Sequence, residues 1–236
     1  MTQQEQEPAT QRRWGLGDAV GGYVVAYFLA GLFGVMWVSI SGNSGDSLGL
    51  AVFSSLGLWI GMGGSVWVAT YRKGSGDLAR EMGFVLRPMD VPVGVAVGLA
   101  CQFVMVPLLY LPFRLNDPNL GNRLEEPARK LNQLASGPGF ALLLFVVVVG
   151  APLIEELFFR GLLLRALEAR FGAAWAVAGS SVAFGLAHYQ PLQFLGLAAF
   201  GVVLSLLAWR TGRLGPGLVA HAVFNLATMV VLAQQH

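Results

Sequence analysis

Apolar residues in this chain fall into long runs that are separated by short polar stretches. A helix needs about 20 mostly apolar residues to cross a hydrocarbon core of roughly 30 Å, and several runs reach that length. We therefore predict an all-α, polytopic membrane protein with about seven transmembrane helices. Their predicted positions are residues 19–40, 48–71, 91–113, a helix that starts near Phe140, and residues 174–188, 192–209 and 216–232.

Some of these runs are irregular. The third contains Pro107 and Pro112, which we expect to bend or end the helix, because proline removes a helix hydrogen bond and clashes with the preceding turn. The fifth, residues 174–188, is short for a full crossing. Residues 1–41 also fit a signal peptide, with basic residues before an apolar run and small residues after it. That run is longer than a usual signal core, which favours a retained helix.

The distribution of polar residues divides the chain into three predicted parts. Residues 1–18 form a polar, disordered tail on the cytoplasmic side. Residues 136–236 form a C-terminal helix bundle that carries polar residues inside its helices. Between them, residues 19–135 form scaffold helices and a polar connecting loop. Glycines of these scaffold helices are expected to permit close helix approach: Gly61, Gly63, Gly64, Gly94 and Gly98.

Composition supports a membrane protein and narrows its chemistry. The chain has 236 residues, of which 55% are hydrophobic and 12% are charged, whereas an ordinary soluble domain carries roughly a quarter charged residues. The net charge of +2 comes from loop arginines that face anionic lipid, and no basic tract indicates a nucleic-acid partner. Cys101 is the only cysteine, which excludes an intrachain disulfide and a cysteine metal cluster.

The basic residues predict a cytoplasmic N-terminus in the cell membrane, because short cytoplasmic loops gather Lys and Arg. The first connection has none, and the second has four: Arg72, Lys73, Arg80 and Arg87. The same orientation places five further arginines on the cytoplasmic side: Arg160, Arg165, Arg170, Arg210 and Arg213. The loop after the third helix departs from the rule. We expect it to be a partly helical cap outside, with charges of both signs: Arg114, Asp117, Arg123, Glu125, Glu126, Arg129 and Lys130.

Polar residues inside the later helices are the candidate functional groups. An ionisable side chain at the bilayer centre costs roughly 2.5–3.5 kcal/mol on insertion scales, so it usually faces a protein interior and has a partner. Residues of this kind, with one aromatic neighbour, lie on three predicted helices: Glu155, Glu156, Arg160, Phe184, His188, His221 and Asn225. The third histidine, His236, is the last residue. Because each buried group needs a partner, we predict one shared polar cluster.

Each motif also has a purely structural interpretation. Glu156 and Arg160 can pair on one helix face, but residues 155–171 could instead form an amphipathic interfacial helix with solvated charges. His188 could be an interfacial histidine bonded to a carbonyl at a helix end, and the polar pair of the last helix could simply join helices. Depth raises an objection too. Counted from the predicted helix starts, Glu155 lies roughly 22 Å from the outer side and His188 about 20 Å from the inner side.

Such a cluster could hydrolyse an amide bond. Glu155 with His188 could bind and deprotonate a water, since a carboxylate in a water-poor pocket can serve as a general base. His221 and Asn225 could donate to a developing oxyanion. A metal version uses the same four residues, Glu155, His188, His221 and Asn225, as zinc ligands with an open position for water. The chain lacks H-E-x-x-H, so metal-bound and glutamate-activated water both stay open.

Three spaced motifs resemble a known family. E-E-x-x-x-R from Glu155, F-x-x-x-H from Phe184 and H-x-x-x-N from His221 follow one another on successive hydrophobic helices. In this order they closely resemble the CPBP family of intramembrane proteases. That family joins eukaryotic CAAX prenyl endopeptidases to bacterial Abi-like proteins linked to bacteriocin processing and self-immunity. The resemblance covers residues 136–236 and identifies them as a catalytic helical core.

The resemblance implies an intramembrane endopeptidase, metallo- or glutamic, with its site in a cavity within the bilayer. It implies that Glu155 activates water with His188, and that His221 and Asn225 line the oxyanion site or bind metal. The other motif residues would support the site or shape its pocket: Glu156, Arg160 and Phe184. The implied cofactor is zinc or none. The implied partners are membrane lipid and a peptide or protein substrate, either CAAX-like or a bacteriocin or leader peptide.

Two other functions compete with a protease. A non-catalytic membrane immunity or scaffold protein could keep the polar cluster for stability alone, although the intact candidate residues argue against this. A proton-coupled transporter also uses intramembrane Glu and His residues. It would need a continuous polar track and paired broken helices in both halves, and the N-terminal half provides neither.

Overall fold

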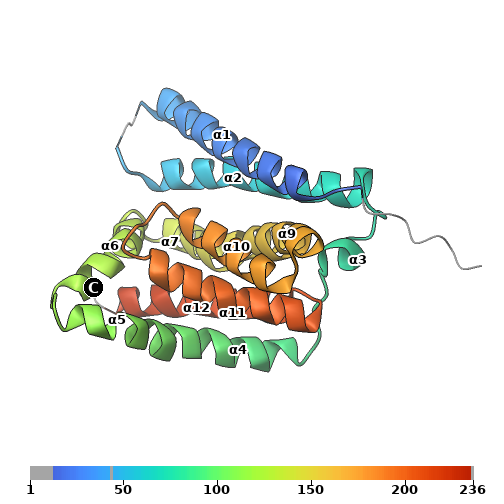
Figure 1. Ribbon diagram of the computed structural model, residues 1–236. Coiled ribbons are helices and arrows are strands. Elements are labelled where there is room, and N and C mark those ends of the chain that lie inside the picture. Colours follow the sequence, from blue (N-terminus) through green and yellow to red (C-terminus); the bar gives the residue numbers. More distant parts are fainter. Residues whose placement is uncertain (1–12, 43–44, 235–236) are drawn as a thin grey trace, which may run out of the picture.

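The structure is a computed structural model that describes residues 13–42 and 45–234, and within these ranges it contains helices and no strands (Figure 1). Residues 1–12 of the tail predicted for residues 1–18, and His236, lie outside the described residues, and the last three residues of that predicted tail already belong to the first helix, which starts at Leu16. Among the rest, six helices are long and apolar enough to cross a membrane: Leu16–Ser41, Leu48–Arg72, Asp90–Arg114, Pro138–Phe171, Phe194–Thr211 and Gly215–Ala233. A shorter apolar helix, Ala173–Leu186, is the predicted fifth. The all-α polytopic membrane architecture is therefore confirmed.

Several long helices combine α-helical segments with wider π-helical ones, in which hydrogen bonds join residues five apart. The first helix is α1 (Leu16–Ser41), and the second comprises α2 (Leu48–Trp67) and η1 (Val68–Arg72). The third comprises α4 (Asp90–Ala100), η2 (Cys101–Met105) and α5 (Val106–Arg114). The fourth comprises α7 (Pro138–Leu144), η3 (Phe145–Gly150), α8 (Ala151–Glu155), η4 (Glu156–Leu163) and α9 (Leu164–Phe171). The others are α10 (Ala173–Leu186), α11 (Phe194–Thr211), α12 (Gly215–Ala233) and the connecting helices α3 (Leu78–Met82) and α6 (Leu120–Gln133).

The third helix shows how the predicted prolines are accommodated. The helix continues through Pro107, which is the second residue of α5 and lies just after the π-helical segment η2. It then ends at Arg114, shortly after Pro112. The loop that follows contains α6, so its partly helical character is confirmed, whereas its position as a cap on the outer side stays a prediction.

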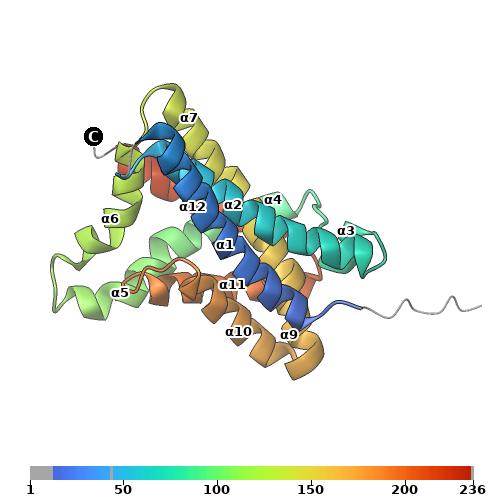
Figure 2. The same ribbon diagram turned by 90° about the horizontal axis from the view of Figure 1, so that it is seen from above.

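The helices form two layers. Figures 1 and 2 show α1 and α2 as an antiparallel pair on one side of a bundle that includes α4, α10, α11 and α12. Within the pair, a Cβ added at Gly61 would lie 2.3 Å from the Cα of Ala26. Within the bundle, α4 approaches α12 so closely that a Cβ at Gly98 would lie 2.6 Å from the carbonyl oxygen of Ala220. The division of the chain at residue 135 stays a prediction, although α4 packs on the C-terminal part.

The predicted role of the scaffold glycines holds for some positions and fails for others. Gly94 resembles Gly98, because an added Cβ would lie 2.5 Å from the Cβ of Val219. At Gly63 the nearest atom would be at an ordinary 3.7 Å, and at Gly64 nothing lies within 4 Å. The sequence pattern could not separate these cases, since a glycine that faces lipid and one that faces a helix look alike.

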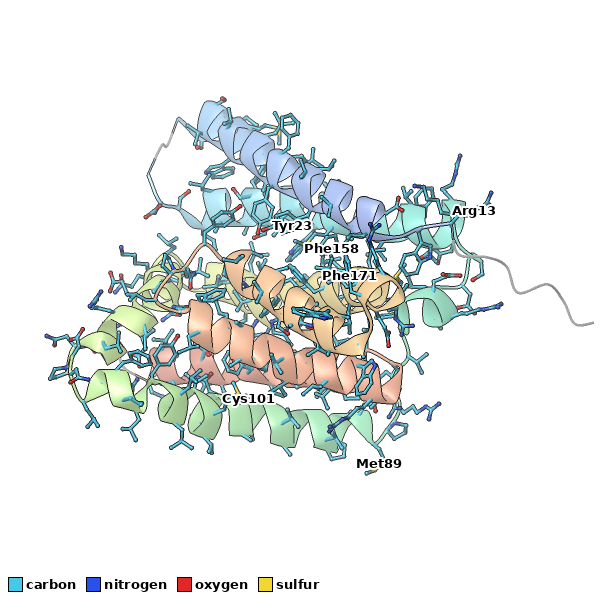
Figure 3. The ribbon with its side chains drawn as sticks, in the orientation of Figure 1. Arg13, Tyr23, Met89, Cys101, Phe158 and Phe171 are labelled. Atoms are coloured by element: carbon cyan, nitrogen blue, oxygen red, sulfur yellow. The ribbon has the colours of Figure 1, made fainter. Side chains whose placement is uncertain are left out.

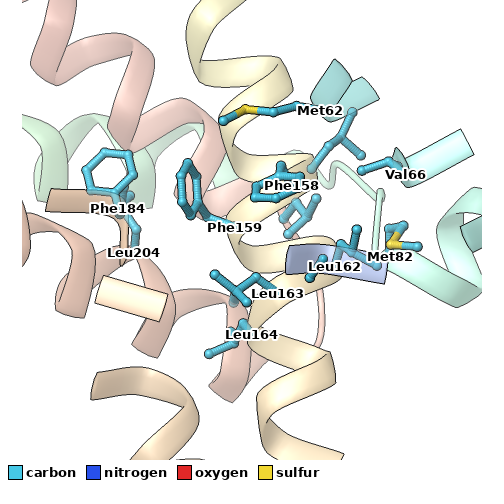
Figure 4. Packing of buried hydrophobic residues seen from close by; sticks show 14 of the residues in the cluster. Met62, Val66, Met82, Phe158, Phe159, Leu162, Leu163, Leu164, Phe184 and Leu204 are labelled. Carbon is cyan, nitrogen blue, oxygen red and sulfur yellow. The ribbon is translucent and has the colours of Figure 1, made fainter. Parts of the chain in front are cut away.

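The segment η4 is the centre of the bundle. Every residue from Glu156 to Leu163 is buried. Figure 4 shows Phe158 directed toward Met62 and Val66, while the neighbouring ring of Phe159 faces Phe184. The interfacial interpretation of residues 155–171 is therefore wrong for this segment, because its charges are enclosed by protein.

Basic residues gather at one end of the molecule, where Arg13 and Met89 are labelled in Figure 3. Lys73 pairs with Asp18 at 2.5 Å, and Arg213 pairs with Asp90 at 2.7 Å. Its hydrogen bonds to Asp90 raise the pKa of the Arg213 guanidinium. Arg160 does not belong to this group. Its side chain is wholly buried in η4 and is not part of a solvated basic loop, and its place on the cytoplasmic side stays a prediction.

Candidate active site

Glu156 and Arg160 form the predicted ion pair inside the bundle. Arg160 Nη1 donates to Glu156 Oε1 at 2.9 Å, and the two side chains are 0% and 1% exposed. Arg160 Nη2 donates to the carbonyl oxygen of Gly201 at 3.2 Å, which ties η4 to α11. The guanidinium carbon also lies 4.4 Å from the ring centre of Phe184. The arginine is thus held by a carboxylate, a carbonyl and an aromatic face.

His221 of α12 joins this pair. Its Nδ1 lies 3.1 Å from Glu156 Oε1, and an ionised carboxylate can only accept, so Nδ1 carries the proton. In the neutral ring the lone pair is then on Nε2. That nitrogen lies 3.8 Å from Glu155 Oε2. Edge-on contacts with Phe184 and Phe200, both at 5.6 Å between ring centres, fix the plane of the imidazole.

Glu155 is the more accessible of the two adjacent carboxylates. Its side chain is 14% exposed, yet its Oε2 is buried and accepts no hydrogen bond from the described residues. Two proton acceptors, Glu155 Oε2 and His221 Nε2, therefore face each other. A water molecule about 2.8 Å from each atom could donate one hydrogen bond to Glu155 Oε2 and the other to His221 Nε2. The arrangement can therefore bind and polarise water.

His188 reaches this cluster through Phe184. It lies in the turn after α10, and its Nδ1 donates to the carbonyl oxygen of Phe184 at 2.8 Å. The fully buried Phe184 ring contacts His188 at 4.8 Å and His221 at 5.6 Å between ring centres. The two histidines thus flank a single aromatic ring. The carbonyl bond of His188 is also what the interfacial interpretation expected.

The depth objection disappears when both residues are counted from the turn that connects their helices. Glu155 and His188 lie on either side of Gly172, at nearly equal separations along the chain. At about 1.5 Å per residue both lie roughly 25 Å from that turn. The depths counted from the predicted helix starts disagreed because they were measured from opposite membrane surfaces. The fourth helix has 34 residues, so at that rise it is roughly 50 Å long and its end does not mark a surface.

Asn225 makes a different contact. Its Nδ2 donates to the carbonyl oxygen of Val147 at 2.8 Å, joining α12 to the wide segment η3. This bond is the interhelical contact of the structural interpretation. An oxyanion role for Asn225 stays a prediction, and the amide keeps a second proton for it.

The candidate metal ligands do not assemble into a zinc site. Zinc in proteins takes three or four nitrogen, oxygen or sulfur ligands at about 2.0–2.3 Å. Across the described ranges, no group of three or more His, Cys, Asp or Glu side chains is arranged to hold a metal ion. As placed, Glu155, His188, His221 and Asn225 do not fit zinc, and no reaction step is derived through a metal.

A hollow of about 430 Å³ lies elsewhere and is lined by Asn132, Gln133, Ala135, Phe140 and Ala233. It contains none of the candidate catalytic residues. The cavity expected around them stays a prediction.

Sequence reasoning missed Tyr27. This residue lies on α1, which we had interpreted as scaffold, yet its hydroxyl donates to the carbonyl oxygen of Ala187, next to His188. Its ring packs edge-on against Tyr189 at 5.3 Å and lies 4.6 Å from Tyr23, measured between ring centres. A signal was present, because Tyr23 and Tyr27 lie four residues apart in an otherwise apolar helix and so share one face.

Comparison with other proteins finds similarity to membrane peptidases. Residues 137–227 match a family model described as "Type II CAAX prenyl endopeptidase Rce1-like", a range that includes all seven candidate residues. The "Putative membrane peptidase YdiL" of Bacillus subtilis (strain 168) is 32% identical over 141 residues, which are 60% of this chain and 54% of the relative. The match thus spans about half the length of that relative. No solved structure matches the chain. This chain is therefore similar, over residues 137–227, to the type II CAAX prenyl endopeptidase family, and over 141 residues to a putative membrane peptidase.

Proposed function

We propose that the protein is an intramembrane endopeptidase that cleaves a peptide bond with a water activated by Glu155. The observation that carries this proposal is the 3.8 Å separation between Glu155 Oε2 and His221 Nε2, next to a buried Glu156 that fixes the Nδ1 proton. Glu155 takes a proton from the water, and the resulting hydroxide attacks the carbonyl carbon. Glu155 then returns the proton to the nitrogen that leaves, so water is consumed and an acid and an amine are formed.

The oxyanion of this reaction needs donors. With each Nδ1 proton committed, to Glu156 in His221 and to the Phe184 carbonyl in His188, either histidine would donate through Nε2 only after taking up a further proton from solvent. Asn225 is the third candidate donor. Arg160 acts indirectly. By compensating the charge of Glu156 it allows a carboxylate to stay buried beside His221.

The substrate class follows from where the site lies and from the family. The cleaved bond belongs to a peptide or protein at or within the membrane, and the candidate classes are a CAAX-like tail and a bacteriocin or leader peptide. The family that matches residues 137–227 is that of CAAX prenyl endopeptidases, which favours the first class. We place the protein in the cell membrane with its N-terminus in the cytoplasm.

A cleavage assay tests the assignment of Glu155. The purified protein in detergent is given a membrane peptide library, and wild type is compared with Glu155→Gln. We expect the variant to lose about 100-fold or more in rate, the usual contribution of a general base. The matched control is Glu168→Gln in α9, an exposed glutamate of the same continuous helix, which should leave the rate unchanged. Equal rates for wild type and Glu155→Gln would remove the assignment. Binding of a membrane partner without any cleavage would favour the scaffold alternative.

The same assay addresses the water-activation mechanism. Because the described side chains do not form a zinc ligand set, we expect cleavage to continue in the presence of a chelator. Loss of cleavage in chelator, followed by recovery with added zinc, would overturn the metal-free mechanism and leave the peptidase assignment intact.

A further inference from the structure

We propose that Tyr27 of α1 is a positioning residue that holds His188 in place for catalysis. The inference rests on the proposed function, because it assigns Tyr27 a part in the same reaction. Tyr27 contacts both sequence neighbours of His188. Its hydroxyl donates to the carbonyl oxygen of Ala187, and its ring packs edge-on against Tyr189 at 5.3 Å and 75°.

The turn that carries His188 needs support from outside its own helix. The α-helix α10 ends at Leu186, and the last carbonyls of a helix have no partner within it. A donor from another helix can satisfy such a carbonyl. Tyr27 supplies that donor to Ala187.

The residue on the other side of His188 is conformationally unusual. Tyr189 has φ of 52°, and it is the one non-glycine residue with positive φ in the described ranges. Side chains disfavour this left-handed region. Tyr189 is 71% exposed, and its ring packs on that of Tyr27, which is one of the contacts that hold this conformation. Without Tyr27 both neighbours of His188 lose a contact that fixes them.

Neighbouring elements support a different part of the loop. Tyr110 of α5 donates to the carbonyl oxygen of Leu192 at 2.8 Å, and Gln193 donates to the carbonyl oxygen of Leu124 in α6. These bonds hold the end of the loop that leads into α11. The part that carries His188 is held by α1. The division offers a matched control, since Tyr27 and Tyr110 each bind one loop carbonyl through a hydroxyl.

The experiment compares Tyr27→Phe with Tyr110→Phe in the full chain, using the best peptide from the cleavage assay. For Tyr27→Phe we expect kcat to fall by about 10- to 100-fold, the usual effect of removing a group that orients a catalytic side chain, with KM unchanged within about twofold. For Tyr110→Phe we expect a lower melting temperature and a kcat within about twofold of wild type. Tyr189→Leu, which removes the ring contact with Tyr27 but keeps the hydrogen bond from Tyr27 to Ala187, should lower kcat in the same direction as Tyr27→Phe.

A double variant separates positioning from a general structural effect. If Tyr27 acts through His188, adding Tyr27→Phe to His188→Ala should lower kcat no further. A further fall in the double variant, or an unchanged kcat in folded Tyr27→Phe, would overturn the inference and leave the proposed function standing. Absence of cleavage by wild type, or full activity of His188→Ala, would instead overturn the proposed catalytic role of His188 and this inference with it.

Discussion

A carboxylate with two donors on one oxygen is the centre of the candidate site. Glu156 Oε1 receives both Arg160 Nη1 and His221 Nδ1, at 2.9 and 3.1 Å. The two residues of the ion pair are almost wholly buried, so neither can be solvated if its partner is lost. A buried pair is not by itself strongly stabilising, but breaking one leaves an uncompensated charge. The stability of the bundle therefore depends on Arg160 more than on its surface arginines.

Arg160→Met should lower the free energy of unfolding by about 3–5 kcal/mol, because it leaves Glu156 charged and buried. Arg129→Met is the matched control. Arg129 also pairs with a glutamate four residues away, Glu125, but the two side chains are 30% and 38% exposed, and its loss should cost about 0.5 kcal/mol or less. Denaturant unfolding in detergent measures both values. Similar costs for the two variants would contradict the buried-charge argument.

How far residue contacts could be predicted depends on their separation in sequence. Glu156 and Arg160 are one helical turn apart, so spacing alone predicted their pairing. The contact between His221 and Glu156 spans 65 residues, and that between Tyr27 and Ala187 spans 160. Such contacts depend on how helices pack. The polarity of His221 and Glu156 predicted that these two residues would meet. Nothing in the pattern of α1 specified which helix Tyr27 would contact.

At the scale of elements, the ends of the helices could be predicted well because apolar runs and polar turns mark them. The fourth helix is the exception. The sequence predicted only its start near Phe140, and the helix continues past the charged residues to Phe171, because Glu156 and Arg160 are paired inside the protein. The wide segments were not predicted either. A π-turn depends on which backbone carbonyls accept hydrogen bonds from neighbouring helices, as the Val147 carbonyl accepts one from Asn225. The periodicity of apolar residues carries no information about such bonds.

Gly98→Ala tests the closest approach between α4 and α12. An added Cβ would lie 2.6 Å from a backbone oxygen of α12, so the helices must separate. We expect a loss of about 1–3 kcal/mol in the free energy of unfolding. Cleavage should also slow, because the contacted residue, Ala220, precedes His221. In Gly64→Ala the new methyl group meets nothing within 4 Å, so stability and activity should stay near wild type. Equal losses in the two variants would contradict close packing at Gly98.

At the scale of the whole molecule, the charged ends predict its orientation. We expect exposed loop positions to differ in accessibility to a membrane-impermeant maleimide in intact cells, in a Cys101→Ser background. Asp46→Cys and Asn116→Cys should be labelled from outside, whereas Ala79→Cys should react only after lysis, because it lies at the arginine-rich end. The reverse pattern would show that the N-terminus faces outward. Equal labelling of all three positions would argue against a fixed orientation.

The hydrogen bond from Tyr27 to Ala187 joins the first spanning helix to a turn 160 residues later. His221 enters the chain later still, on the last helix. During synthesis, therefore, the carboxylates of the fourth helix are inserted well before either imidazole can join them. Under the proposed function, a newly made molecule gains its activity only after α12 has docked, so the order of synthesis delays any cleavage of neighbouring proteins.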